Sequence, residues 1–593
     1  MRIRSRDWAV LAIVLLGFHV LGTALVRYYY GYYIAHYDSV GGLVQSIQTL
    51  EVYHDQGYVA GLAAAWEKAP LSITQSLFAA VFAPYIDPDP QGMQLYNTLA
   101  FGVAALGMLV LLRRFGVGIP AILLGMAGIL LGDALYWWDL GAFDFRRDFG
   151  LYGLTCGMLL LGAAYLAGPL KTKREVALGL LFGVVTGLTL ICRDSAPVLM
   201  MGVAIVPLGA LWAFSGFRDG WMPQLRKVAW PLIGFAPFAV IFFLKLGQLL
   251  DRVSNPLVMY GIDANGSNTL ISNARRIPDA VLGLFSYPYN KAPWLSTILV
   301  LLTFAGLGYI CFRAWRAMKS GAGEAATAET GAADAASEKR ARTRVVWFLL
   351  GTAVWTPVFL HLFFAVYLKW AADQPPIVAM APYMLTLAGL SAAIAAALVF
   401  GAPQFSTRTG KGIALALFAA ISLAIPARAL TRMIQYLPGT YESHLDLARL
   451  SNLSGGPAIV AGLTDRTELM RIPAIQLLAL QRSLPLLQQL SVHTHEGQTV
   501  DFQIGIPDDP ALRASILDAM DKALRCDADY IVASLDPAFY ARSGERILIY
   551  AHGAEMVGGI IADLSGAVVR TLDPEKTTVL LDNRRRQTCP SGQ

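Results

Sequence analysis

Charged residues are scarce in this chain. Asp, Glu, Lys and Arg make up 15% of the 593 residues, whereas 55% are hydrophobic, and the mean hydropathy is +0.51. Soluble globular domains carry about 25% charged residues, so this composition excludes an ordinary soluble enzyme. The lipid bilayer is the expected solvent for most of the chain.

Cysteine is rare as well, with five residues. No CxxC pair or tight His/Cys cluster occurs, so the pattern does not support a zinc site. Cys156, Cys192 and Cys311 lie in or at the ends of apolar segments. Cys526 and Cys589 lie in the C-terminal portion, which we predict to be exported. An oxidising compartment would allow a disulfide between them, and free thiols are the alternative.

The chain also lacks basic segments with interleaved aromatic residues, which are typical of nucleic-acid grooves. Its net charge is nevertheless +6. Most of the basic excess falls in short loops between apolar segments, where it sets the orientation of membrane helices. We therefore expect membrane lipids, and no nucleic acid, as partners.

Long apolar runs are what the sequence does contain. A helix needs about 17–25 apolar residues to cross the hydrocarbon core. We predict a polytopic α-helical membrane protein with about eleven such helices, a re-entrant segment being the alternative for the shortest. They lie at roughly 8–27, 95–112, 118–137, 149–169, 176–192, 196–215, 228–247, 295–312, 345–368, 376–400 and 412–428.

The orientation of these helices follows from the Lys and Arg residues of the short loops. With the N-terminus in the cytoplasm, the basic residues of every second loop fall on the same side. The first apolar segment is too long for a signal core, and Arg27 with three tyrosines is a poor cleavage site, so we expect a permanent helix. The cytoplasmic cations are then Arg2, Arg4 and Arg6, Arg113-Arg114, Lys171-Thr172-Lys173-Arg174, Arg218 with Arg226-Lys227, the stretch 313–344, and Arg408 with Lys411.

An odd number of helices sends the C-terminal portion to the outside of the cytoplasmic membrane. We predict a membrane domain over 1–439, with a flexible cytoplasmic linker at 321–337, and a small extracytoplasmic α/β domain over 440–593. The linker is nearly all Gly, Ala, Glu and Thr. The α/β domain has no nucleophile elbow, phosphate loop or metal motif. Its strands are expected at 458–463, 530–535, 546–550 and 578–581, with a helix from about 508 to 524.

The outer loop over 28–94 holds the first candidate for chemistry. Amphipathic helical runs at about 39–53 and 58–66 are expected to lie along the membrane interface, where a lipid-linked substrate would arrive. Asp38 stands just outside the first helix, where a carboxylate is costly and often functional. It is our candidate catalytic base, and a cap for the next helix is the alternative role.

Several cations stand at outer helix ends, against the positive-inside bias. Arg146 and Arg147 precede the fourth segment, Arg193 follows the fifth, Lys245 ends the seventh and Lys369 follows the ninth. Guanidinium groups bind phosphate oxygens bidentately and lysine supplies a point charge, so a phosphate head group would explain them. Alternatively, the arginines pair with neighbouring acids, namely Asp144, Asp148 and Asp194.

No cofactor is required by these patterns. Glu51, His54 and Asp55 have a spacing that would place Glu51 with His54 or Asp55 on one helical face, where a divalent metal is possible. Solvated polar side chains are the simpler interpretation. Asp55, Asp144 and Asp148 are also kept as secondary acidic candidates for the base.

The outer-loop motifs resemble those of the GT-C integral-membrane glycosyltransferases, especially the bacterial protein O-mannosyltransferases and lipid A aminoarabinose transferases. The resemblance covers about 1–430 and rests on Tyr37-Asp38-Ser39 followed by Glu67-Lys68-Ala69-Pro70-Leu71. This family commonly has an Asp-Glu pair in the first loop and a Glu-Lys-Pro-Pro-Leu-like turn after it. Ser39 and Ala69 depart from the pattern, and Ser39 places a metal or substrate role of the second acid in doubt.

Weaker similarities follow at Arg147-Asp148, at Leu190-Ile191-Cys192-Arg193-Asp194-Ser195 and at Pro376 to Pro382-Tyr383. The resemblance implies transfer of a sugar from a polyprenyl-phosphate carrier to a glycan, lipid or protein acceptor at the outer face. Phosphate leaves without protonation, so one carboxylate base can suffice, and nearby cations stabilise the developing charge. Asp38 would be the base, Arg146, Arg147, Arg193 and Lys369 would contact the phosphate, and Glu67-Lys68 would shape the pocket.

A transporter or flippase for a lipid-linked sugar is an alternative, and so is a ligase that joins polysaccharide to a lipid from a diphosphate carrier. Transporters more often show internal repeats and charged or broken helices at mid-membrane depth. We find no clear two-half repeat here and few ionisable residues at the centres of the apolar segments.

Overall fold

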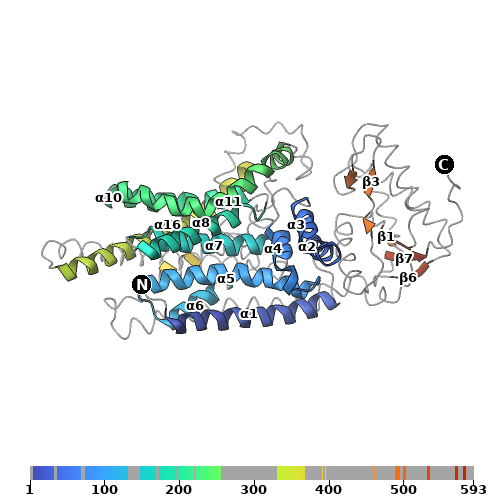
Figure 1. Cartoon of the computed structure of the whole chain (residues 1–593), viewed down its shortest axis with the longest axis horizontal. Helices are drawn as coiled ribbons and strands as arrows, with labels where there is room; N and C mark the ends of the chain where they lie inside the picture. Colours follow the sequence, from blue (N-terminus) through green and yellow to red (C-terminus); the bar gives the residue numbers. More distant parts are fainter. Residues whose placement is uncertain are drawn as a thin grey trace, which may run out of the picture.

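The computed structural model describes residues 4–32, 37–67, 74–130, 147–168, 172–193, 196–219, 221–254 and 330–367, scattered positions between 387 and 398, and short strands between 458 and 582. Within these ranges the chain is mostly helical (Figure 1). The helices are α1 (Ser5–Tyr32), α2 (Tyr37–Gln56), α3 (Tyr58–Glu67), α4 (Thr74–Phe82), the 3₁₀ turn η1 (Ala83–Tyr85), α5 (Pro90–Arg114), α6 (Ile119–Ile129), α7 (Arg147–Leu166), α8 (Thr172–Leu190), α9 (Ala196–Met200), the π-helical turn η4 (Met201–Ile205), α10 (Val206–Asp219), α11 (Trp221–Ser254) and α16 (Thr330–Tyr367).

The predicted apolar segments coincide with these helices wherever the structure describes them. The segments from 8–27 through 228–247, and the one at 345–368, fall on described helices, with 118–137 described only to residue 130 and 196–215 made of α9, η4 and α10. The segments at 295–312 and 412–428 lie outside the described residues, and 376–400 is described only at scattered positions, so the total of eleven stays a prediction. Among the described helices, four are long and apolar enough to cross a bilayer, over Ser5–Arg27, Pro90–Arg114, Phe149–Leu166 and Gln224–Gly247.

Glycines set how closely the central helices pack. On α7, Gly153 lies against the backbone of Ala100 on α5, where an added Cβ would come 2.7 Å from the Ala100 carbonyl oxygen. On α8, Gly183 lies against the Pro231 carbonyl of α11, and no room is left there for a side chain. Small residues let membrane helices approach to van der Waals contact of their backbones, which drives association in lipid. These two glycine contacts bring α5 onto α7 and α8 onto α11.

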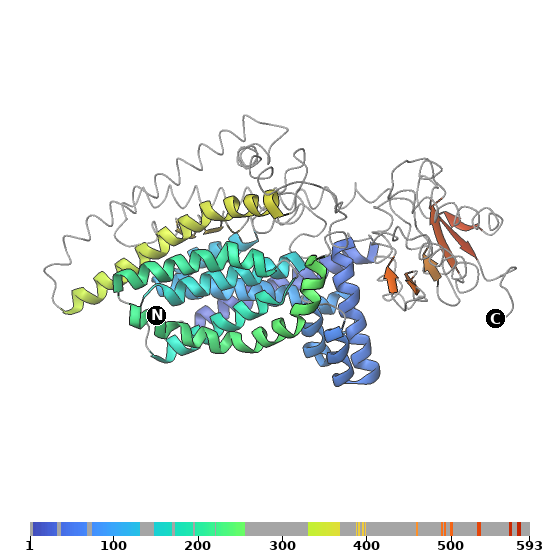
Figure 2. The same cartoon turned by 90° about the horizontal axis from the view of Figure 1, so that it is seen from above.

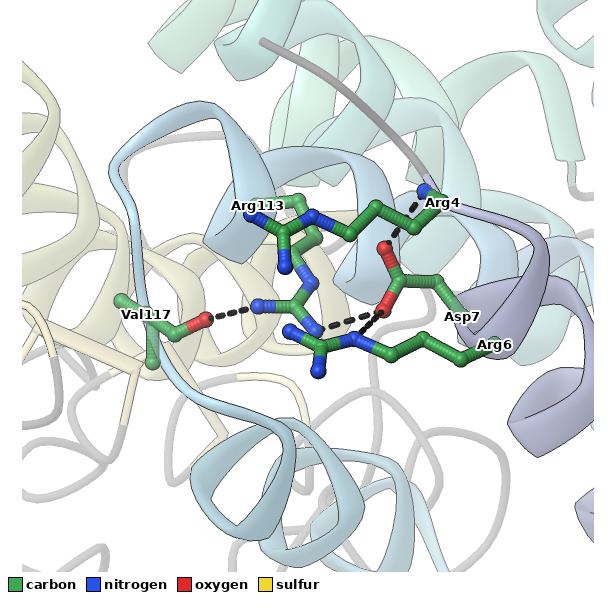
Figure 3. Close-up of polar contacts among 5 residues, drawn as sticks. All are labelled: Arg4, Arg6, Asp7, Arg113 and Val117. Carbon is green, nitrogen blue, oxygen red and sulfur yellow. Dashed lines mark hydrogen bonds and ion pairs between the residues drawn. The ribbon is translucent and has the colours of Figure 1, made fainter.

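Polar contacts join helix ends at what we call the Arg113 end of the bundle. Asp7, in the first turn of α1, accepts a 2.5 Å bond from the Arg113 guanidinium at the end of α5 (Figure 3). Arg113 also donates to the Val117 carbonyl at 2.9 Å, and the Arg4 backbone N–H donates to Asp7 at 2.8 Å. The ends of α1 and α5 are therefore held together by one buried carboxylate.

Other cations meet carbonyl groups at the same end. Lys227 of α11 donates to the Gly168 carbonyl after α7 at 3.0 Å, Arg114 donates to the Ala164 carbonyl, and Arg342 of α16 donates to the Phe115 carbonyl. All of these cations were predicted to face the cytoplasm. The structure confirms that they share one end of the bundle, while the side of the membrane on which that end lies stays a prediction.

The outer loop forms a layer across the opposite end. Figure 2 shows α2 running across the bundle at a steep angle to the long helices. Helices α2 and α3 match the amphipathic runs predicted at 39–53 and 58–66. Helix α4 was not predicted, because its short apolar sequence between Ser72 and Pro84 has no helical periodicity long enough to distinguish it. Exposed Tyr58, Val59 and Tyr85 on this layer fit an interfacial position.

Short strands beyond residue 440 form two sheets. They are β1 (Ala458–Val460), β2 (Gln488–Gln489), β3 (Ser491–His493), β4 (Thr499–Asp501), β5 (Tyr530–Ser534), β6 (Val568–Thr571) and β7 (Thr578–Asp582). The larger sheet has the order β2-β1-β5-β7-β6, with β1 parallel to β2 and β5, and β7 antiparallel to β5 and β6. Strands β3 and β4 form an antiparallel pair. Parallel neighbours need long crossover connections, as expected of an α/β domain.

Three predicted strands coincide with β1, β5 and β7. The predicted strand at 546–550 and the predicted helix at 508–524 lie outside the described residues, so the boundaries and the α/β character of a domain over 440–593 stay predictions. Strands β2, β3, β4 and β6 were not predicted, because they are two to four residues long and carry polar residues.

The predicted cytoplasmic linker needs a correction. Helix α16 begins at Thr330, so residues 330–337 are helical instead of flexible. The cause is alanine, which has the highest intrinsic helix propensity and here extends the helix that follows. Residues 321–329 lie outside the described residues.

Candidate functional site

Four helices converge on a small hydrophobic cluster, which marks what we call the Trp66 end of the bundle. Ile191, just after α8, is 1% exposed and packs with Trp66 of α3, Leu77 of α4 and the α11 residues Phe238, Ile241 and Phe242. Thr74 at the start of α4 also donates to the Leu188 carbonyl at 3.4 Å. The outer loop is thus packed directly on the end of α8.

Lys245 reaches Trp66 from α11. Its ammonium donates to the Trp66 carbonyl at 2.5 Å and lies 4.5 Å from the centroid of the Trp66 ring. The residue is 2% exposed, and it interacts electrostatically with Glu67, the last residue of α3. A cation predicted at the outer end of the seventh segment therefore lies beside Glu67 of the motif.

Arg193 lies at the same end, directly after α8. It is partly buried, and its carbonyl accepts a 2.9 Å bond from the Ala196 N–H that opens α9, which closes a tight turn. The preceding Cys192 is buried, with its sulfur 3.5 Å from the Tyr96 hydroxyl of α5. Arg193 is therefore carried by a turn that α5, α8 and α9 hold in place.

Buried polar side chains line the first turns of α5 beneath the outer loop. Asn97 donates to the Gln94 side-chain oxygen at 3.3 Å, and the Thr98 hydroxyl lies 3.1 Å from His19 Nδ1 on α1. Sequence reasoning missed this layer. Polar residues at 94, 97 and 98 inside an otherwise apolar run were the signal that could have found it.

Asp89 caps α5 at this end. Its carboxylate accepts a 2.6 Å bond from the Gly92 N–H. Burial raises the pKa of the Asp89 carboxyl above its ordinary value, and the Gly92 hydrogen bond opposes that rise. The contact is that of a helix N-cap, so a structural role explains Asp89.

The candidate base Asp38 is the second residue of α2. It therefore lies within the first turn and not before it, although its side chain is outside the described part. Arg147 and Asp148 are the first two residues of α7, and their side chains are likewise not described. Asp55 is exposed near the end of α2. Lys68, Asp144, Arg146, Lys369, Cys526 and Cys589 lie outside the described residues.

The structure thus brings Glu67 and Lys245 together and places Arg193 at the same end. It does not place Asp38 relative to them at the level of side chains. Among the described residues, no group of three or more His, Cys, Asp or Glu side chains is arranged to hold a metal ion, and Glu51, His54 and Asp55 form no such group.

No protein-family model and no curated protein matches the sequence. Two solved structures are similar to it, both of ArnT from Cupriavidus metallidurans. The apo structure has a TM-score of 0.48 and 13% identity, and the structure bound to undecaprenyl phosphate has 0.49 and 12%. Each comparison covers 99% of this chain and 100% of the ArnT chain.

Proposed function

We propose that the chain is a membrane glycosyltransferase that moves a sugar from a polyprenyl-phosphate carrier to a hydroxyl-bearing or amide-bearing acceptor at the outer face of the cytoplasmic membrane. The observation that carries the proposal is the assembly at the Trp66 end, where the motif residue Glu67, the cation Lys245 and the turn with Arg193 are packed together. The described cations that are predicted to face the cytoplasm, Arg113, Arg114, Lys227 and Arg342, lie at the Arg113 end instead.

The proposed reaction needs two kinds of group from the protein, cations for the carrier phosphate and one base for the acceptor. The carrier phosphate is a good leaving group once its charge is balanced, and Arg193 offers guanidinium N–H groups for that purpose. Arg146, Arg147, Lys68 and Lys369 are proposed as further contacts. The acceptor must lose a proton as it attacks, and Asp38 is the proposed base. The carrier is of the class that the similar ArnT structure binds, but the proposal rests on these residues.

The test compares native protein with Asp38→Asn in cells that lack the gene. Mass spectrometry of cell-envelope glycans should find a sugar that native protein restores. Asn keeps the size of Asp and removes the basic oxygen, so Asp38→Asn should insert and bind donor but turn over about 10²–10⁴ times more slowly. Near-normal turnover in a folded Asp38→Asn protein would remove the catalytic role of Asp38.

A second arm measures binding of undecaprenyl phosphate to purified protein. Arg193→Ala should weaken it roughly ten- to a hundredfold, the effect of losing a hydrogen bond between charged groups. If Asp38→Asn turns over normally, Asp55, Asp144 and Asp148 are the acids to test next. If none of them proves essential, and cells that lack the gene accumulate the lipid-linked sugar in the cytoplasmic leaflet, the flippase alternative is favoured.

A further inference from the structure

We infer that Lys245 is a positioning residue, which holds the end of α3 so that Glu67 and the Arg193 turn keep fixed places around the carrier phosphate. The inference deepens the proposed function and rests on it for the identity of the ligand. Its structural part rests on contacts among described residues.

The first contact is a helix cap supplied from another helix. The last four carbonyl groups of a helix have no partner within that helix, and the Trp66 carbonyl is one of them in α3. The Lys245 ammonium donates to this carbonyl and places its charge at the negative end of the helix dipole. Glu67 of the motif is the last residue of α3, so Lys245 caps the helix at the point where the motif begins.

The second contact is with the Trp66 ring. The ammonium lies 4.5 Å from the ring centroid, within the range of a cation–π interaction. A lysine that is 2% exposed is costly to bury unless its charge is engaged. The Trp66 carbonyl, the Trp66 ring and the nearby Glu67 engage it from the same helix end, which makes α3 dependent on α11.

Trp66 links the held end of α3 to the Arg193 turn. Its side chain belongs to the cluster around Ile191, two positions before Arg193. If the end of α3 shifts, the contact with Ile191 changes too. One buried lysine on α11 therefore fixes two segments that are proposed to face the same phosphate.

Helix α11 offers a matched control at its other end. Lys227 is 5% exposed and donates to the Gly168 carbonyl, just past the end of α7, at 3.0 Å. It makes the same kind of contact at the Arg113 end, far from the proposed site. Lys245→Met and Lys227→Met each remove a buried ammonium of α11 and keep most of the apolar volume.

The first experiment measures undecaprenyl phosphate affinity and steady-state kinetics with purified protein. Lys245→Met should raise the dissociation constant and the donor KM roughly tenfold or more, with a smaller change in kcat, because the phosphate site is displaced while the base stays. Lys245→Arg keeps a donor for the Trp66 carbonyl and should recover most of the affinity. Lys227→Met should lower the thermal midpoint without changing donor affinity.

Equal loss of affinity in Lys245→Met and Lys227→Met would overturn the inference, because Lys245 would then act only through global stability. If Lys245→Arg has a normal thermal midpoint but does not recover the affinity, the inference is also overturned, because the lysine would then act directly on the phosphate. Native protein that does not bind undecaprenyl phosphate would contradict the proposed function instead.

The second experiment measures how accessible the chain is just after α3, without any ligand. Ala69→Cys is introduced into the native, Lys245→Met and Lys227→Met proteins, and the rate at which a maleimide labels Cys at position 69 is measured. The same three proteins without Ala69→Cys give the background labelling. The rate should change several-fold in Lys245→Met and stay as in native protein in Lys227→Met. If the labelling rate in Lys245→Met equals that in the native protein, Lys245 does not position the end of α3. That result overturns the inference whatever the ligand is.

Discussion

Asp7 and Arg113 show what single residues contribute to this fold. They are 106 positions apart in the chain and are bonded at 2.5 Å, with Asp7 1% and the Arg113 side chain 12% exposed. Arg6 lies 4.0 Å from the same carboxylate but is 57% exposed. Because removing one partner of a buried pair leaves an uncompensated charge, the two arginines should differ greatly in effect.

Asp7→Leu should therefore lower the free energy of unfolding by roughly 3–5 kcal/mol, and the double variant Asp7→Leu with Arg113→Met should recover much of that loss. Denaturation of the purified proteins, followed by circular dichroism, measures this. Arg6→Met is the matched control and should change stability by about 0–1 kcal/mol. A loss for Arg6→Met as large as that for Asp7→Leu would argue against the buried pair as the source.

At the scale of elements, close helix contacts depend on glycine. The helices α8 and α11 both run from the Arg113 end towards the Trp66 end, and Gly183 lies where their backbones touch. Gly209 on α10 has no described atom within 4 Å of where its Cβ would lie. The same substitution at the two sites separates packing from helix propensity.

Gly183→Ala should destabilise the protein by roughly 1–3 kcal/mol, because the Pro231 carbonyl belongs to the backbone and cannot rotate away. Gly209→Ala should be neutral or stabilising by up to about 1 kcal/mol, as alanine favours helix over glycine. Thermal midpoints of the two variants give the comparison. Equal midpoints would mean that α8 and α11 are not held together by this contact.

At the scale of the whole molecule, the basic residues Arg113, Arg114, Lys227 and Arg342 of the described residues gather at one end of the bundle. This is the arrangement that the positive-inside rule predicts for a chain that crosses the membrane repeatedly. The rule predicts that the Arg113 end lies in the cytoplasm and that the Trp66 end, with its proposed phosphate site, lies outside.

Reporter fusions at Gly331 and at residue 593 should accordingly report opposite compartments, cytoplasmic for the first and extracytoplasmic for the second. Gly331 lies in the first turn of α16, ahead of the Arg342 contact with α5. A fusion at Arg174, also predicted to be cytoplasmic, is the control for Gly331. If both Gly331 and residue 593 report one compartment, the helix count is wrong and the Trp66 end loses its assigned side.

The sequence by itself predicted the apolar helices that the structure describes, and it predicted that Arg113, Arg114, Lys227 and Arg342 lie on one side. Long apolar runs predict helices on local grounds alone, because a backbone in lipid must satisfy its hydrogen bonds within its own helix. The spacing of Lys and Arg is likewise read from the sequence without any tertiary contact. The motif resemblance likewise marked Asp38 and Glu67 without any knowledge of the fold. The propensity of alanine, a local property, was underestimated at 330–337 and would have placed the start of α16 correctly.

Only the tertiary structure decided which of these residues meet. Lys245 and Trp66 are 179 positions apart, and Tyr96 and Cys192 are 96 apart, so no periodicity relates them. Their contacts arise from helix packing, which depends on side-chain volume and on glycine positions along two different helices. A lysine near the end of an apolar segment carries the same local signal at 227 and at 245. Lys227 binds the Gly168 carbonyl just past the end of α7, whereas Lys245 caps α3 beside the proposed site, because packing brings a different helix end to each.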